Sequence, residues 1–342
     1  MTRKAIQIVN RHKDKLYGFS WTVDDQEKLI GNIIIITGMQ ESAERYDDFA
    51  RYLVSNNYSV FCIDHYGQGL NAGSANEKLG VWPESAFRKM VNTIDDLVVQ
   101  LRLTCRPTYI IGHSMGSFVL QDYIQRYTEH VAKVVLVGSA RKPFAPSLGY
   151  GLARLLVPRV RTPKVKRDKD GRVIKAKNSK TPSWYKKNPT LHNLALGNPN
   201  KLVIKQHKDA IKSGSIPADS PTPHVYSWLS YEPGNIRRYA DNPQCGGINA
   251  GGFYREFFKG LSRLNKKKFL AKIRPSLSIL IVGGEEDPIG NYGKELVSLH
   301  KQYRNVGVKD VKLRLYPKMR HEVLNETEKE RVYKDILDFI KE

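Results

Sequence analysis

Residues 109–117 read Tyr-Ile-Ile-Gly-His-Ser-Met-Gly-Ser, an apolar run that leads into a serine with glycines two positions to either side. The residues that follow, 117–124, are compatible with a helix. A serine on a sharp strand-to-helix turn stands exposed above a sheet, and the flanking glycines relieve the crowding of that turn. The pattern predicts a nucleophile at Ser114, and the alternative interpretation is a plain tight turn.

Apolar runs closed by turn residues recur along the chain. They cover residues 33–38, 58–64, 133–138, 277–283 and 311–317. Near-continuous runs are typical of parallel strands covered on both faces, and only the last run alternates like a half-exposed edge. Helical spacing of apolar residues occupies the connections at 44–56, 84–103, 115–127 and 326–340. The pattern predicts a mostly parallel, doubly wound α/β sheet, to which an N-terminal antiparallel hairpin is added.

The strand pattern breaks after residue 139 and returns near residue 273. We therefore predict a core formed by residues 1–139 and 273–342, interrupted by a helical cap or lid at 140–272. Within the cap, residues 160–181 have the composition of a loop or hairpin, with Asp170-Gly171 at its turn.

The chain is strongly basic, and its charge is concentrated in one segment. It holds 56 Lys and Arg against 34 Asp and Glu, a net charge of +22, and residues 141–213 contribute 19 basic and three acidic side chains. Such a field favours anionic partners. We expect this segment to contact an anionic membrane surface, and the alternative is a solvated lid. Specific nucleic-acid binding is disfavoured, because only Trp184 and Tyr185 offer nearby stacking surfaces.

Cysteine usage and the N-terminus bear on the compartment. Cys62, Cys105 and Cys245 are an odd, sparse set without metal-ligand spacing, which is typical of a reducing compartment. Residues 1–11 lack the apolar stretch of a signal peptide, and no run approaches the ~18 apolar residues of a spanning helix. We expect a cytoplasmic protein, with peripheral membrane contact left open, that uses neither a metal nor a cofactor.

A serine hydroxyl needs a base, and folds of this kind supply an acid and a histidine later in the chain. His321 follows the last predicted strand and is the favoured base. Asp287, at the turn after the run 277–283, is the favoured acid because Pro288 stiffens that turn; Glu286 and Glu285 are the alternatives. The other histidines weighed for the role of base are His113, His192, His207, His224 and His300.

The developing negative charge on a substrate oxygen needs hydrogen-bond donors. The backbone N–H of Met115, directly after the serine, and that of Met39, after the first central strand, are the natural pair. The alternative for Met39 is an ordinary turn at the end of a strand. Residues 64–69 are rich in glycine but lack a phosphate-binding lysine, so a structural turn is expected there.

Two segments resemble the monoacylglycerol lipase and lysophospholipase group of the α/β-hydrolase superfamily. Residues 37–41 with Arg45-Tyr46 are similar to that group's HGMxE…RY motif, and residues 64–69 to its DxRGHG loop. The resemblance implies a Ser114, His321 and Asp287 triad, with Met39 and Met115 as oxyanion amides. Thr37, Tyr66 and Gln68 depart from the motifs, where the group has histidine, arginine and histidine.

The expected activity is therefore that of a serine carboxylester hydrolase acting on single-acyl lipids, a monoacylglycerol or a lysophospholipid, through an acyl-enzyme. Alternatives with the same triad are a peptidase, a thioesterase and an acyltransferase. Apolar side chains of the cap are expected to line the acyl pocket: Leu152, Leu155, Phe253 and Phe257, with Leu156, Val157 and Phe258.

Overall fold

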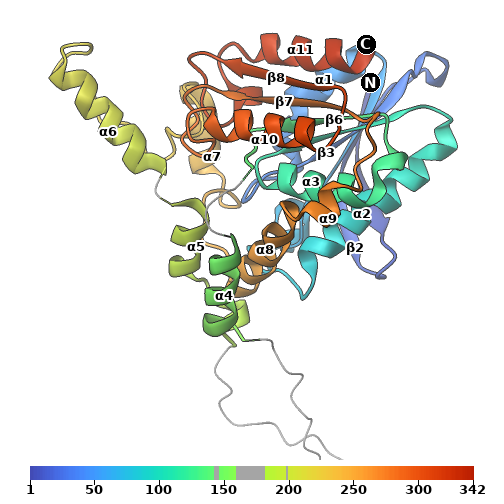
Figure 1. Cartoon of the computed structure of the whole chain (residues 1–342), viewed down its shortest axis with the longest axis horizontal. Helices are drawn as coiled ribbons and strands as arrows, with labels where there is room; N and C mark the ends of the chain where they lie inside the picture. The colour runs from blue at the N-terminus through green and yellow to red at the C-terminus, as the bar shows by residue number, and fades with distance from the viewer. Residues whose placement is uncertain (142–145, 159–181, 198) are drawn as a thin grey trace, which may run out of the picture.

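The computed structural model describes residues 1–141, 146–158, 182–197 and 199–342, and its strands form one eight-stranded sheet (Figure 1). They are β1 (Thr2–Val9), β2 (Lys15–Thr22), β3 (Gly31–Ile36), β4 (Tyr58–Ile63), β5 (Thr108–His113), β6 (Lys133–Val137), β7 (Ser278–Gly284) and β8 (Val311–Tyr316). The order is β1-β2-β4-β3-β5-β6-β7-β8. The pairs from β4 to β8 are parallel, whereas β1–β2 and β2–β4 are antiparallel. The predicted mostly parallel sheet and its N-terminal hairpin are confirmed.

Helices cover both faces of the sheet. They are α1 (Asp47–Ser55), α2 (Ala86–Leu101), α3 (Met115–Tyr127), α4 (Pro146–Leu156), α5 (Pro189–Leu196), α6 (Pro199–Lys212), α7 (Pro233–Asp241), α8 (Gly251–Leu264), α9 (Lys267–Leu270), α10 (Lys294–Asn305) and α11 (Lys329–Lys341). The buried side chains of α1 and α11 form one apolar cluster, and those of α2, α3 and α10 form another. No helix among the described ranges is long and apolar enough to cross a membrane.

Strand β3 explains why the sequence reads as continuous apolar runs. Ile33 and Ile35 face the cluster with α1 and α11, whereas Ile34 and Ile36 face the cluster with α2 and α3. All four are fully buried, because successive strand residues point to opposite faces and both faces are covered. Strand β8 lies at the edge and is only partly buried, as its alternation predicts.

Helices α4 to α9 lie between β6 and β7, in the segment predicted as a cap. Helix α8 packs on the core, with the ring of Phe257 6.5 Å from Phe87 on α2 and 6.2 Å from Phe118 on α3. Helix α6 extends away from the sheet (Figure 1). The loop predicted at 160–181 lies outside the described residues, and the division into core and cap stays a prediction.

Candidate active site

Ser114 occupies the turn between β5 and α3 in a backbone conformation that is rare for a residue with a side chain. Its φ is 50° and its ψ is −118°. The turn is tight enough that a Cβ on Gly112 would approach the carbonyl oxygen of Gly116 to 2.7 Å, and a Cβ on Gly116 would overlap the carbonyl of Ile36. Both glycines are therefore required sterically, and they leave the serine hydroxyl at the carboxyl edge of the sheet.

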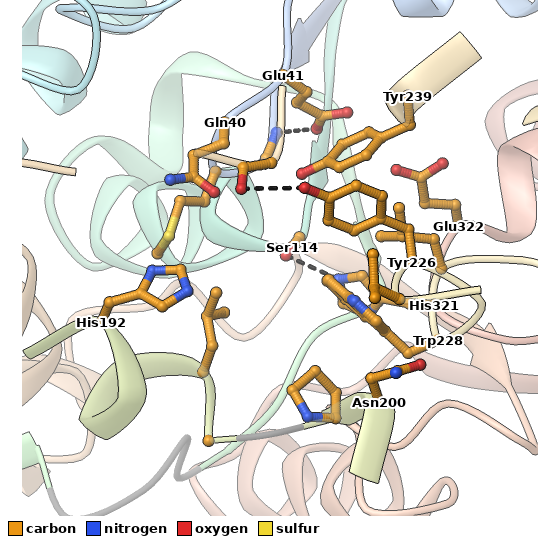
Figure 2. A pocket seen from close by; sticks show the side chains of 18 of the residues that line it. Gln40, Glu41, Ser114, His192, Asn200, Tyr226, Trp228, Tyr239, His321 and Glu322 are labelled. Carbon is orange, nitrogen blue, oxygen red and sulfur yellow. Dashed lines mark hydrogen bonds between the residues drawn. The ribbon is translucent and has the colours of Figure 1, made fainter. Parts of the chain in front are cut away.

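The ends of three parallel strands bring Ser114, His321 and Asp287 together. The Oγ of Ser114 lies 2.8 Å from the Nε2 of His321 (Figure 2). The Nδ1 of His321 lies 2.9 Å from the Oδ2 of Asp287. Asp287 is fully buried, and its second oxygen accepts the N–H of Ile289 at 2.8 Å. The alternative acid Glu286 instead accepts a hydrogen bond from the hydroxyl of Tyr231.

Met39 and Met115 flank the serine. Met39 lines the cavity at Ser114. Met115 is the first residue of α3, and the N–H groups at the amino end of a helix stabilise nearby negative charge. Among the described residues, neither of these two N–H groups donates to a protein acceptor. A Cβ on Gly38 would lie 3.2 Å from the Cβ of Ser114, so the loop after β3 closely approaches the serine.

A cavity of about 360 Å³ opens at Ser114. Its apolar wall comes from Met39, Leu196, Val225, Trp228 and Leu229. Its polar wall comes from Gln40, His192, Asn193, Asn200, Tyr226 and Tyr239 (Figure 2). The cavity therefore offers both apolar and polar surface to a group that reaches Ser114.

The four apolar residues expected to form an acyl pocket do not line this cavity. Phe253 and Phe257 are buried in the core beneath it, and Leu152 packs partly against the same core. Leu155 is 81% exposed on α4. Their hydrophobicity predicted a pocket, but α8 uses its phenylalanines to attach the segment to α2 and α3. The lining residues of α5 and of the loop 225–229 were missed, because no local pattern marks them.

A buried ionic network lies behind the loops that carry Met39 and Ser114. The carboxylate of Glu41 accepts hydrogen bonds from the Gly38 N–H, the Tyr46 hydroxyl at 2.7 Å and Arg45 at 3.1 Å, and lies 3.1 Å from the Nδ1 of His113. Burial alone would raise the pKa of Glu41, but His113 and Arg45 outweigh it and lower that pKa to about 2. Burial alone would lower the pKa of His113, yet the charge of Glu41 raises it. Glu41 is therefore ionised beside the serine turn.

Two of the other histidines weighed as the base, His192 and His300, lie within hydrogen-bond distance of groups other than Ser114. His192 lines the cavity, and its Nδ1 lies 2.7 Å from the hydroxyl of Tyr254. The Nε2 of His300 lies 3.1 Å from the carbonyl of Val311, and His224 is exposed. Within the described ranges, only His321 lies within hydrogen-bond distance of the Ser114 hydroxyl.

Residues 27–328 match the family described as Hydrolase_4, "Serine aminopeptidase, S33". That match covers most of the chain. The chain belongs to this S33 family. The α/β-hydrolase membership that the motifs predicted is thereby confirmed, and the S33 match includes Ser114, Asp287 and His321 within its bounds.

Curated relatives of this S33 member include two lipases. It is 28% identical over 120 residues to a monoacylglycerol lipase of Mycolicibacterium smegmatis, and 28% identical over 131 residues to a human monoglyceride lipase. These matches cover 35% and 38% of the chain, and the chain spans about two fifths, 41%, of each relative. Among solved structures, a thermostable carboxyl esterase from Bacillus coagulans is similar, with a TM-score of 0.78 at 19% identity, covering 100% of the chain and 98% of that structure.

Proposed function

We propose that the protein is a serine carboxylester hydrolase that acts on single-acyl lipids, a monoacylglycerol or a lysophospholipid. The observation that carries this proposal is the hydrogen-bonded series from Ser114 through His321 to Asp287 at a cavity with both apolar and polar lining residues. Membership of the S33 family and the relatedness to two lipases support the same conclusion.

The geometry suggests the order of events. His321 Nε2 takes the hydroxyl proton as Ser114 Oγ attacks the ester carbonyl carbon, while Asp287 holds the Nδ1 proton and stabilises the imidazolium. The oxyanion is held by the N–H groups of Met39 and Met115. The C–O bond to the alcohol then breaks, the alcohol leaves with the proton from His321, and water cleaves the acyl-enzyme by the same steps.

The cavity wall favours an ester with one apolar and one polar part. The acyl chain would lie against Leu196, Val225 and Trp228, and the alcohol part against Tyr226 and Asn200. The volume of about 360 Å³ lies near the lower end of ligand pockets, which favours a small substrate over a bulky one.

The family is described as a serine aminopeptidase family, but the charges in the cavity disfavour aminopeptidase activity. A carboxylate that is free of other cations is the strongest partner for a substrate ammonium. The two acidic side chains that line the cavity, Glu41 and Glu322, are both paired with Arg45. A transfer to an acceptor other than water would use the same groups, and no feature of the cavity favours it over hydrolysis.

A fluorophosphonate probe tests the nucleophile. We expect intact-mass spectrometry to detect one adduct on the wild-type protein and none on Ser114→Ala or His321→Ala. His12→Ala serves as the matched control, because this histidine is exposed at the turn between β1 and β2. Adduct formation that survives Ser114→Ala would overturn the proposal. Hydrolysis of a panel of monoacylglycerols, lysophospholipids and aminoacyl amides by the labelled and unlabelled protein then identifies the substrate class.

We further propose that α6 binds anionic membrane surfaces. Lys205, Lys208 and Lys212 recur at helical spacing, so they share one face, and all three are exposed. The first residues of the same helix, Pro199 and Asn200, line the cavity. A membrane that binds these lysines would therefore lie close to the cavity, and its single-acyl lipids could enter there.

Vesicle cosedimentation tests this contact. Each well-placed lysine contributes about 1 kcal/mol at an anionic surface, so replacing all three by Gln should weaken binding to phosphatidylserine-containing vesicles on the order of 100-fold. The matched control replaces Lys266, Lys267 and Lys268 by Gln. These three substitutions remove the same charge from another exposed site. Equal binding to neutral and anionic vesicles, or equal losses in both triple variants, would instead mark α6 as a solvated face.

A further inference from the structure

Gln68 is buried against the loop that connects β3 to α1. It belongs to the loop after β4, is 1% exposed, and directs its amide at backbone groups of the neighbouring loop. Its Oε1 accepts the N–H of Gln40 at 3.1 Å, and its Nε2 donates to the carbonyls of Gly38 at 2.9 Å and Glu41 at 3.0 Å. One neutral side chain thus holds three backbone groups on both sides of Met39.

These contacts determine the orientation of one peptide bond. A trans peptide is planar, so the carbonyl of Gly38 and the N–H of Met39 point in opposite directions. Because Gln68 holds the Gly38 carbonyl, the Met39 N–H faces away from Gln68. The Gly38 N–H is held in turn by the carboxylate of Glu41. Rotation of the peptide between residues 38 and 39 would break the hydrogen bond from Gln68 to the Gly38 carbonyl, while the peptides before and after it stay held by Glu41 and Gln68.

The loop needs such support because part of its backbone is strained. Gln40 has a φ of 58°, a conformation that costs a residue with a side chain roughly 1 kcal/mol or more. The N–H of Gln40 donates to the side-chain oxygen of Gln68. Without the side chain of Gln68, the loop would lose the hydrogen bond that offsets the strained conformation.

Gln68 is itself held in place. Its loop is tied to the loop after β3 by the carboxylate of Asp64, which accepts the N–H of Ala43 at 2.7 Å and the N–H of Leu70 at 2.9 Å. The N–H of Gln68 donates to the carbonyl of His65 at 3.1 Å. The side chain therefore acts from a rigid base, although it stands where the motif of similar proteins has a histidine.

We propose that Gln68 is a positioning residue that orients the Met39 N–H toward the oxyanion. The inference rests on the proposed function, since it assigns a cause to one of the two oxyanion donors. An amide does not titrate. Replacing Gln68 should therefore lower kcat by the same factor at every pH. Replacing a residue that titrates would instead give a factor that changes with pH.

The test uses Gln68→Met, which keeps the size of the side chain and removes all three hydrogen bonds. With a soluble short-chain ester, we expect kcat to fall roughly 10- to 100-fold while KM changes less than about 3-fold, because the donor matters most in the transition state. The ratio of variant to wild-type kcat should stay constant across the pH profile. The matched control is Gln125→Met. It removes the hydrogen bond of a buried amide to the Leu264 carbonyl, near the carboxyl end of α3 and away from Ser114.

Active-site titration separates positioning from folding. Fluorophosphonate counts the competent serines, so kcat is expressed per titrated site. If kcat per site equals that of wild type and only the number of sites falls, Gln68 is merely structural and the inference is wrong. Should Gln68→Met not fold, Gln68→Glu tests kcat and KM per titrated site at one pH, because a carboxylate keeps the size but cannot donate to Gly38 or Glu41; the pH profile is compared only for variants without a titrating side chain at this position. A wild-type protein without Ser114-dependent ester hydrolysis would instead overturn the proposed function itself.

Discussion

Arg45 donates two hydrogen bonds of 2.7 Å to the two carboxylate oxygens of Glu322, the residue that directly follows His321. The same guanidinium donates to Glu41 at 3.1 Å, and Glu41 holds the loop that carries Met39. One cation therefore joins the loop that carries Met39 to the loop that carries His321. Bidentate geometry and burial make this pair different from the exposed ion pairs of the surface.

Replacing Arg45 by Met should destabilise the protein strongly, because it leaves two buried carboxylates without their cation. We expect the free energy of unfolding, measured in urea, to fall by about 3 to 5 kcal/mol. The matched control is Arg51→Met, which removes an exposed pair with Asp47 and should cost less than about 1 kcal/mol. Similar losses in the two variants would show that the buried network contributes no more than a surface pair.

His65 should make stability depend on pH in a defined window. Burial lowers the pKa of His65 from 6.5 to about 4 in the folded protein, while its ring stays within 2.9 Å of the Thr37 carbonyl. Between these values the unfolded chain binds more protons, so the free energy of unfolding falls as the pH is lowered from 6.5 toward 4. Its contribution over this window is about 3 kcal/mol.

The His65→Gln variant isolates this contribution, because the glutamine amide can still donate to Thr37 but does not titrate. Urea unfolding of both proteins at several pH values should give a difference that grows below pH 6.5 and is constant above it. A difference that is independent of pH would mean that His65 is protonated equally in the folded and unfolded states.

Substitution by alanine should lower the free energy of unfolding at Gly116 and raise it at Gly151. Alanine at Gly116 would place its Cβ against the carbonyl of Ile36, so we expect a loss of about 3 kcal/mol and loss of fluorophosphonate labelling. Nothing lies within 4 Å of a Cβ at Gly151 on α4, where alanine should stabilise the helix by up to about 1 kcal/mol. Urea unfolding of the two variants checks both signs, and a neutral Gly116→Ala would argue against the tight turn.

Leu196 and Leu155 distinguish the observed cavity from the acyl pocket expected from the sequence. Leu196→Trp fills part of the cavity, so kcat/KM for long-acyl esters should fall on the order of 10-fold relative to an acetyl ester. Leu155→Trp changes a side chain that is 81% exposed and should leave the chain-length preference unaltered. The reverse result would place the acyl chain along α4 instead.

Features that depend on local sequence could be predicted closely. The run 109–113 followed by glycine, serine and glycine specified a strand, a strained turn and α3, and the structure has β5 at Thr108–His113 and α3 at Met115–Tyr127. Likewise, the even burial of β3 and the partial burial of β8 follow from continuous and alternating apolar patterns. These features are local because strand pairing and helix formation depend on residues that are near one another in the chain.

The tertiary structure alone decided which distant side chains meet. The bridge from Arg45 to Glu322 spans 277 residues, and Gln68 reaches its loop across 27 to 30 residues. Sequence patterns record burial and periodicity but not the partner of a buried polar group, because a partner is chosen by the packing of the whole sheet. For the same reason the phenylalanines of α8 look like a pocket in the sequence yet form the core. The sequence determined the turn that carries Ser114 and the succession of strands and helices along the chain; folding determined what surrounds that turn.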